Sequence, residues 1–173
     1  MKNLNEQINK MKSIMGLSEG ILVYRGEGNG FGDAENEGFL WVATDKTVAM
    51  DYASYDSDKR SFNVKEFMID EPRNVFKFPY KYNVAVKGSD ISNNLRLVRD
   101  IKYKNKELDL DDYRWLSDKI DEYIKLAGEN VESYHTKIDK PLASRVLADI
   151  LSYMGYDAIQ IDTDRGITLG LIK

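Results

Sequence analysis

The sequence has no cysteine, a single histidine (His135) and no long hydrophobic run. Without cysteine, the chain cannot form disulfide bonds, thiolate metal sites or a cysteine nucleophile. One histidine is too few for an ordinary transition-metal site, so we expect no bound metal. No stretch approaches the length of a membrane span, and the N-terminus lacks the apolar segment of a secretory signal. We therefore expect a cytoplasmic protein without a membrane partner.

Neither sign of charge dominates the chain. Its 25 basic and 29 acidic residues give a net charge of −4 over 173 residues. This balance creates no global field that would attract nucleic acid or an anionic membrane, although a local basic patch would still allow a nucleic-acid target. The length suits a single domain that spans residues 1–173.

The first residues have the pattern of an amphipathic helix. Leu4, Ile8, Met11 and Met15 fall on one helical face, and Gly16 is a suitable end. We expect this helix, within residues 1–16, to pack against the core of the same domain. Docking onto a partner protein is the alternative.

Short strands outnumber helices along the rest of the chain. The pattern predicts strands at 21–24, 39–43, 62–69, 75–78, 82–86 and 95–98, turns at 88–90 and 93–94, and a final hairpin of 158–161 with 167–172. Helical spacing predicts helices at 45–55, 110–127 and 142–154, the last of which ends at Gly155. Strands and helices do not alternate regularly, which favours an α+β fold over a doubly wound sheet.

The most informative stretch begins where an apolar segment meets a cation. The predicted strand at 21–24 ends at Arg25, and a loop rich in glycine leads to the strand at 39–43. Glycines let a backbone approach a phosphate or a flat ring closely. Thr44 and Asp45 then supply oxygens that could cap the following helix, and a simple N-cap is the structural interpretation of Thr44.

These features resemble the ADP-ribosyltransferase superfamily. Tyr24-Arg25-Gly26 is similar to the strand that carries the family's arginine, and Thr44 stands where members have Ser or Thr, often within Ser-Thr-Ser. Gly155-Tyr156-Asp157 and the acidic hairpin after it are similar to the end of many small bacterial and phage members. The resemblance covers residues 21–86 and 141–173. It implies a split core of two packed, mainly antiparallel sheets with flanking helices.

The resemblance also implies an NAD site. Arg25 would hold the NAD phosphates, since a guanidinium fork matches phosphate geometry. Thr44 would brace the pocket, Tyr52 would border the nicotinamide, and Tyr24 and Gly26 would flank the arginine as further cofactor-binding residues. Arg25 as an ordinary surface residue that closes a strand is the alternative.

The acid that would face the ribose has three possible positions. Gln160, Asp162 and Asp164 alternate along the chain, so they share one face of an extended strand, opposite Ile159 and Ile161. Family members usually have glutamate here, and aspartate is one methylene shorter. We rank Asp164 slightly ahead of Asp162 as the catalytic acid, while plain turn-forming residues are the structural alternative.

The sequence thus predicts an NAD-dependent mono-ADP-ribosyltransferase that modifies a macromolecule. Its resemblance to small phage members implies a phage effector that acts on a host protein in the host cytoplasm. Two other functions remain open at this point. One is a decayed member of the family that occludes a partner, and the other is an NAD glycohydrolase with water as acceptor.

Overall fold

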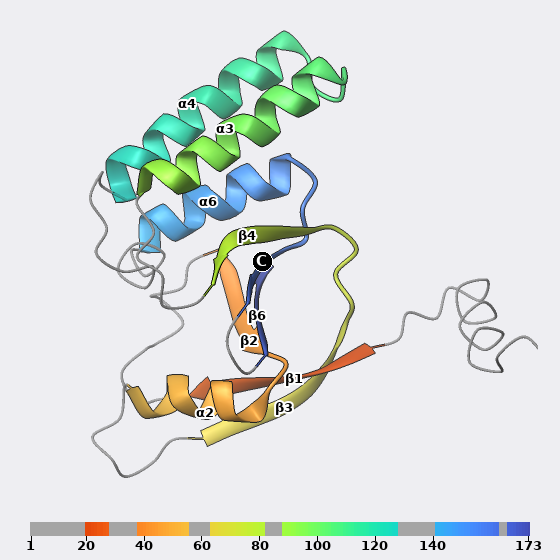
Figure 1. Cartoon of the computed structure of the whole chain (residues 1–173), viewed down its shortest axis with the longest axis vertical. Helices are drawn as coiled ribbons and strands as arrows, with labels where there is room; N and C mark the ends of the chain where they lie inside the picture. Colours follow the sequence, from red (N-terminus) through yellow and green to blue (C-terminus); the bar gives the residue numbers. More distant parts are fainter. Residues whose placement is uncertain (1–19, 28–37, 56–62, 82–87, 128–140, 163–165) are drawn as a thin grey trace, which may run out of the picture.

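A computed structural model describes residues 20–27, 38–55, 63–81, 88–127, 141–162 and 166–173 (Figure 1). These residues form one six-stranded sheet and four helices, so the α+β class is confirmed. Three predictions from the sequence lie outside the described ranges. They are the N-terminal helix within 1–16, the strand at 82–86 and the role of Asp164 as the catalytic acid.

The six strands hydrogen-bond in the order β3-β1-β2-β6-β5-β4, and only β4 and β5 are parallel. The strands are β1 (Gly20–Glu27), β2 (Phe39–Ala43), β3 (Asn63–Asp70), β4 (Val75–Lys81), β5 (Ala158–Asp162) and β6 (Ile167–Ile172). In these residues, the register of β1 with β2 consists of one pair, Tyr24 and Ala43. β1 and β3 run across the direction of β2 and β6 (Figure 1). The two separate sheets that we expected are therefore one sheet divided into two lobes, β3–β1 and β2–β6–β5–β4.

The two lobes bend toward one face of the sheet, which we call the inner face. Side chains alternate between faces along each strand, and cross-strand partners share a face. Buried Val23 of β1 packs with Val42 and Leu169 of the other lobe, together with partly buried residues such as Phe67. Because both lobes contribute to this cluster, it holds them at their mutual angle.

Helices cover the opposite, outer face. α2 (Lys46–Tyr55) packs on β1, and the other lobe is covered by α6 (Pro141–Tyr153), on which α3 (Gly88–Lys104) and α4 (Leu110–Ala127) are stacked (Figure 1). α6 contributes Leu147, Ile150 and Leu151, all fully buried, to the main core. Gly155 follows this helix with φ of 83°, a left-handed conformation that glycine adopts without strain, as predicted.

One part of the predicted secondary structure is wrong. Residues 95–98 were expected as a strand and residues 88–90 and 93–94 as turns, but all of them lie within α3. Ile91, Leu95 and Arg99 are buried at intervals of four residues, which is the spacing of one helical face. The short apolar window at 95–98 fits either period, and packing against α4 and α6 decides for the helix.

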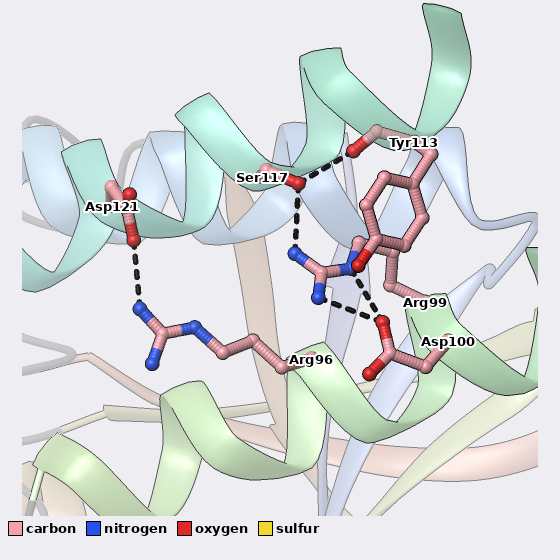
Figure 2. A network of polar contacts seen from close by, with 6 residues as sticks. All are labelled: Arg96, Arg99, Asp100, Tyr113, Ser117 and Asp121. Atoms are coloured by element: carbon pink, nitrogen blue, oxygen red, sulfur yellow. Dashed lines mark hydrogen bonds and ion pairs between the residues drawn. The ribbon is translucent and has the colours of Figure 1, made fainter. Parts of the chain in front are cut away.

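α3 and α4 are joined by a polar network around a buried arginine (Figure 2). Arg99 is 8% exposed and donates hydrogen bonds to Asp100 at 2.9 and 2.7 Å and to Ser117 at 2.8 Å. Its guanidinium lies 4.2 Å from the ring centre of Tyr113. The charge is thus satisfied where the helices meet, as a buried cation requires.

Candidate functional site

Four strands are linked by one row of cross-strand neighbours. The row is Tyr24 of β1, Ala43 of β2, Thr168 of β6 and Ile161 of β5. Arg25, Thr44 and Asp162 each follow a member of this row directly in the sequence. Because neighbouring strands lie about 4.8 Å apart, the row spans about 14 Å. Arg25 lies on one side of this row and Thr44 and Asp162 lie on the other, because β1 runs antiparallel to β2 whereas β2 and β5 run in the same direction.

Thr44 is fixed to the beginning of β6. Its Oγ1 accepts a hydrogen bond from the Ile167 N–H at 3.1 Å and donates to the Ile167 carbonyl at 3.3 Å. The Thr44 N–H also donates to that carbonyl, at 2.9 Å. The residue that caps α2 is Asp45, whose carboxylate accepts from the N–H groups of Thr47 at 2.7 Å and Val48 at 3.3 Å. The interpretation of Thr44 as the N-cap is therefore wrong, and its hydroxyl holds the end of β2 to the start of β6.

The carboxyl end of β5 has the predicted alternation. Ile159 and Ile161 are buried, at 0% and 2% exposed, on the outer face. Gln160 and Asp162 lie on the opposite, inner face, where Gln160 is cross-strand partner of Leu169. The Gln160 Nε2 donates to the Asp162 carboxylate at 2.8 Å, which orients that exposed carboxylate.

Arg25 lies on the inner face, whereas its two neighbours serve the outer face. Tyr24 packs with the apolar residues of α2, and the Lys46 Nζ lies 5.9 Å from its ring centre. A Cβ on Gly26 would stand 2.1 Å from the Ala49 carbonyl oxygen, so only glycine lets α2 approach β1 this closely. Tyr24 and Gly26, which were predicted to bind the cofactor beside Arg25, therefore face the opposite side of the sheet from the Arg25 side chain.

On the outer face of the β3–β1 lobe, a basic side chain is paired with an acidic one. Lys46 and Glu66 form an ion pair at 2.6 Å. The hydrogen bond to Glu66, together with the attraction between the two charges, raises the pKa of Lys46 above its ordinary value. Both side chains are exposed, so this pair adds little to stability.

Two of the predicted residues cannot be compared with the others. Asp164 lies outside the described ranges, and for Tyr52 only the backbone, within α2, is described. Sequence reasoning did not pair Lys65 of β3 with Arg25, although the two are direct cross-strand partners. An alternating strand gives no sign of its register, so no signal in the sequence could have paired these two cations.

A depression of about 570 Å³ lies elsewhere, where the β3–β4 turn meets the ends of α3 and α6. It is lined by Arg73, Asn74, Val75, Lys102, Met154, Gly155 and Tyr156. Beside it, the carboxylate of Asp157 accepts from the N–H groups of Arg73 at 3.0 Å and Asn74 at 2.9 Å. Asp157 of the Gly-Tyr-Asp motif thus holds a turn. We assign no catalytic or binding role to this depression, because it is open and none of its lining residues was predicted as a site residue.

The described residues contain no group of three His, Asp or Glu side chains that could hold a metal ion. In the same part of the chain, no helix is both long and apolar enough to cross a membrane. Comparison with family models, with curated proteins and with solved structures found no match.

Proposed function

We propose that the protein is an NAD-dependent mono-ADP-ribosyltransferase that modifies a macromolecular target. The observation that carries the proposal is that Arg25, Thr44 and Asp162 each directly follow a member of one row of cross-strand neighbours. A guanidinium, a fixed hydroxyl and an oriented carboxylate are the groups that the reaction requires. The division of the sheet into two lobes that meet at one residue pair also supports the split core of this superfamily.

The proposed chemistry assigns one role to each group. Arg25 binds the diphosphate of NAD through its paired N–H donors. The bond between nicotinamide and ribose breaks, nicotinamide leaves with the bonding electrons, and the ribose carbon becomes oxocarbenium-like. Asp162 or Asp164 places negative charge beside that carbon and orients the acceptor. The acceptor atom then bonds to the ribose carbon and loses its proton, which completes the transfer.

Thr44 has a supporting role in this proposal. Its hydroxyl is already committed to Ile167 at the start of β6, so it fixes β2 against the hairpin that carries the acids. The hydrogen bond from Gln160 to Asp162, 2.8 Å long, likewise limits the rotamers of that carboxylate. Positioning of this kind lowers the cost of reaching the reactive geometry.

The target belongs to the proposal as well. The likeness to small phage members favours a protein of the host as the acceptor, modified in the host cytoplasm, and a nucleic-acid acceptor is the alternative. The test is incubation of the protein with labelled NAD and a bacterial lysate, followed by mass spectrometry of the labelled material. We expect ADP-ribose on a defined side chain of one or a few host proteins.

Variants connect this activity to the site. We expect Arg25→Gln to weaken NAD binding about 10- to 100-fold, since hydrogen bonds to charged groups contribute about 1.5–3 kcal/mol. Asp162→Asn and Asp164→Asn, made separately, identify the acid by loss of labelling with NAD binding retained. Arg96→Gln is the matched control, because Arg96 pairs with Asp121 at 2.8 Å on the α3–α4 surface. Equal NAD affinity in Arg25→Gln and the wild type would refute the assignment.

The other two functions give different results in the same assays. A glycohydrolase would release nicotinamide from NAD without any lysate and label nothing. A decayed binding module would show neither labelling nor hydrolysis, and calorimetry would detect no NAD binding. Either pattern contradicts the proposed transferase.

A further inference from the structure

An exposed apolar surface lies on the outer face of the β3–β1 lobe, beside the part that α2 covers. α2 packs over the Gly26 end of β1, where Tyr24 and Val64 contact its apolar residues. The start of β1 extends past this helix (Figure 1). There Leu22 is 46% exposed, and its direct cross-strand partner, Met68, is 62% exposed. Cross-strand partners have Cβ atoms about 4.5–5.5 Å apart and point to the same face, so the two side chains form one apolar surface.

The alternation of side chains shows which face this surface belongs to. Val23 is fully buried in the inner cluster, so Leu22 beside it points to the outer face. Gly20 lies on the outer face as well, and a Cβ there would stand 3.0 Å from the Met68 Cε. We call Gly20, Leu22 and Met68 the β1 entry surface, because the chain enters the sheet at this point. Apolar area left in water is unfavourable, so this surface gains from being covered.

The segment directly before the β1 entry surface has an apolar face of its own. The sequence predicts an amphipathic helix within residues 1–16, with one face formed by Leu4, Ile8, Met11 and Met15. This segment lies outside the described residues, and its pattern comes from the sequence alone. Only residues 17–19 separate it from β1. An extended link of this length reaches about 10–14 Å, so the end of the predicted helix stays close to the surface.

We propose that residues 1–16 dock as an amphipathic helix on the β1 entry surface. In this arrangement Met11 and Met15 contact the surface, and methionine suits such contacts because its flexible side chain fills irregular apolar gaps. The short link keeps the segment at a high effective concentration, and a segment of the same chain loses less freedom on docking than a separate partner. These two effects favour it over a second molecule on so small a surface. The helix lies on the face opposite Arg25, so the inference does not depend on the NAD chemistry.

The test is disulfide cross-linking in the full chain, which contains no natural cysteine. Met15→Cys combined with Met68→Cys puts one thiol on each side of the proposed contact. Mild oxidation of dilute protein should form a disulfide within one molecule, measured by non-reducing electrophoresis and intact mass. Ser13→Cys combined with Met68→Cys is the matched control, because residues two apart lie on different faces of a helix. We expect the Met15 pair to cross-link about tenfold faster, because docking raises the effective concentration of that thiol alone.

Hydrogen exchange gives a second measurement on the full chain. In the wild type, the amides of residues 4–15 should exchange more slowly than those of a free peptide of the same sequence. Met68→Asp should abolish this protection, because docking would bury the new charge. Leu97→Asp is the control, since Leu97 is 57% exposed on α3, over the other lobe (Figure 1). Unchanged protection of α6 in both variants verifies that the fold is intact.

The inference stands if the Met15 pair cross-links faster than the Ser13 pair and the protection of residues 4–15 depends on Met68. Equal rates for the two pairs would indicate an undocked segment and overturn it. Disulfides that join two molecules would identify a second copy as the occupant and overturn it as well. Exchange of residues 4–15 at the free-peptide rate in the wild type, or an equal loss of protection in Leu97→Asp, has the same consequence. None of these results bears on the proposed transfer from NAD, which is measured separately.

Discussion

At the scale of single residues, glycine in the Tyr-Arg-Gly motif has a packing role. A side chain at Gly26 would overlap the backbone of α2, with the Ala49 carbonyl oxygen 2.1 Å from the added Cβ and the Cβ of Ala53 at 2.9 Å. Arg25 and Gly26 are adjacent in sequence and act on opposite faces of the sheet. Arg25 faces the side of the proposed ligand, and Gly26 sets the distance between β1 and α2.

Gly26→Ala should therefore destabilise the protein. We expect a loss of about 2–3 kcal/mol, because the obstructing atom is backbone and relief requires movement of α2. The measurement is the midpoint of urea-induced unfolding, compared with Gly20→Ala on the same strand. At Gly20 the nearest atom is the flexible Met68 Cε at 3.0 Å, so that substitution should cost much less. Equal midpoints for the two variants would contradict this account of Gly26.

At the scale of elements, the junction of β2 and α2 divides two tasks between adjacent side chains. Asp45 satisfies the free N–H groups at the start of α2. Thr44 ties the end of β2 to Ile167 of β6. The helix start is therefore secured independently of the hydroxyl that faces the hairpin, and Gly166 leaves room for this contact, because a Cβ there would approach the Thr44 hydroxyl to 3.3 Å.

The two tasks should separate in experiment. Asp45→Ala should lower the free energy of unfolding by about 1 kcal/mol, the usual effect of removing an N-cap, and leave NAD affinity nearly unchanged. Thr44→Val should cost about 0.5–1 kcal/mol, since its partners stay accessible to water, yet weaken NAD binding by releasing the hairpin. Chemical denaturation and calorimetry on both variants measure the two effects. Equal losses of NAD affinity in both would contradict this division of tasks.

At the scale of the whole molecule, the angle between the lobes depends on the inner cluster. The lobes are joined by one cross-strand pair, Tyr24 with Ala43, and Val23, Val42 and Leu169 fill the bend at 0%, 2% and 5% exposure. The main core lies on the other face, beneath α6. The small cluster therefore controls how Arg25 on one lobe is placed relative to Asp162 on the other, while the large core supplies most of the buried surface.

Core substitutions on the two faces should then differ in their effect on binding. Leu169→Ala and Leu147→Ala should each lower the free energy of unfolding by about 2–4 kcal/mol, because each leaves a cavity. Measured on protein that is still folded, NAD affinity should fall about tenfold, or about 1.4 kcal/mol, only in Leu169→Ala. Calorimetry at low temperature makes the comparison. A similar loss of affinity in Leu147→Ala would show that the bend is not controlled by the inner cluster.

The sequence by itself determined the elements with strong local patterns. The strand at 39–43, the helix at 110–127, the end of α6 at Gly155 and the final hairpin all follow from periodicity and glycine chemistry, which act over a few residues. The alternation of Gln160 and Asp162 against Ile159 and Ile161 was readable for the same reason. The strand expected at 95–98 failed because a four-residue apolar window fits two periods.

Only the tertiary structure decided which distant residues meet. Strand register and sheet order determine three of these contacts. They are the single pair of Tyr24 with Ala43, the pair of Arg25 with Lys65 and the hydrogen bond between Thr44 and Ile167. Register is fixed by the packing of complete faces, since a shift of one residue would expose every buried side chain of a strand. No local pattern in the sequence contains that information, because it arises when both lobes close over the inner cluster.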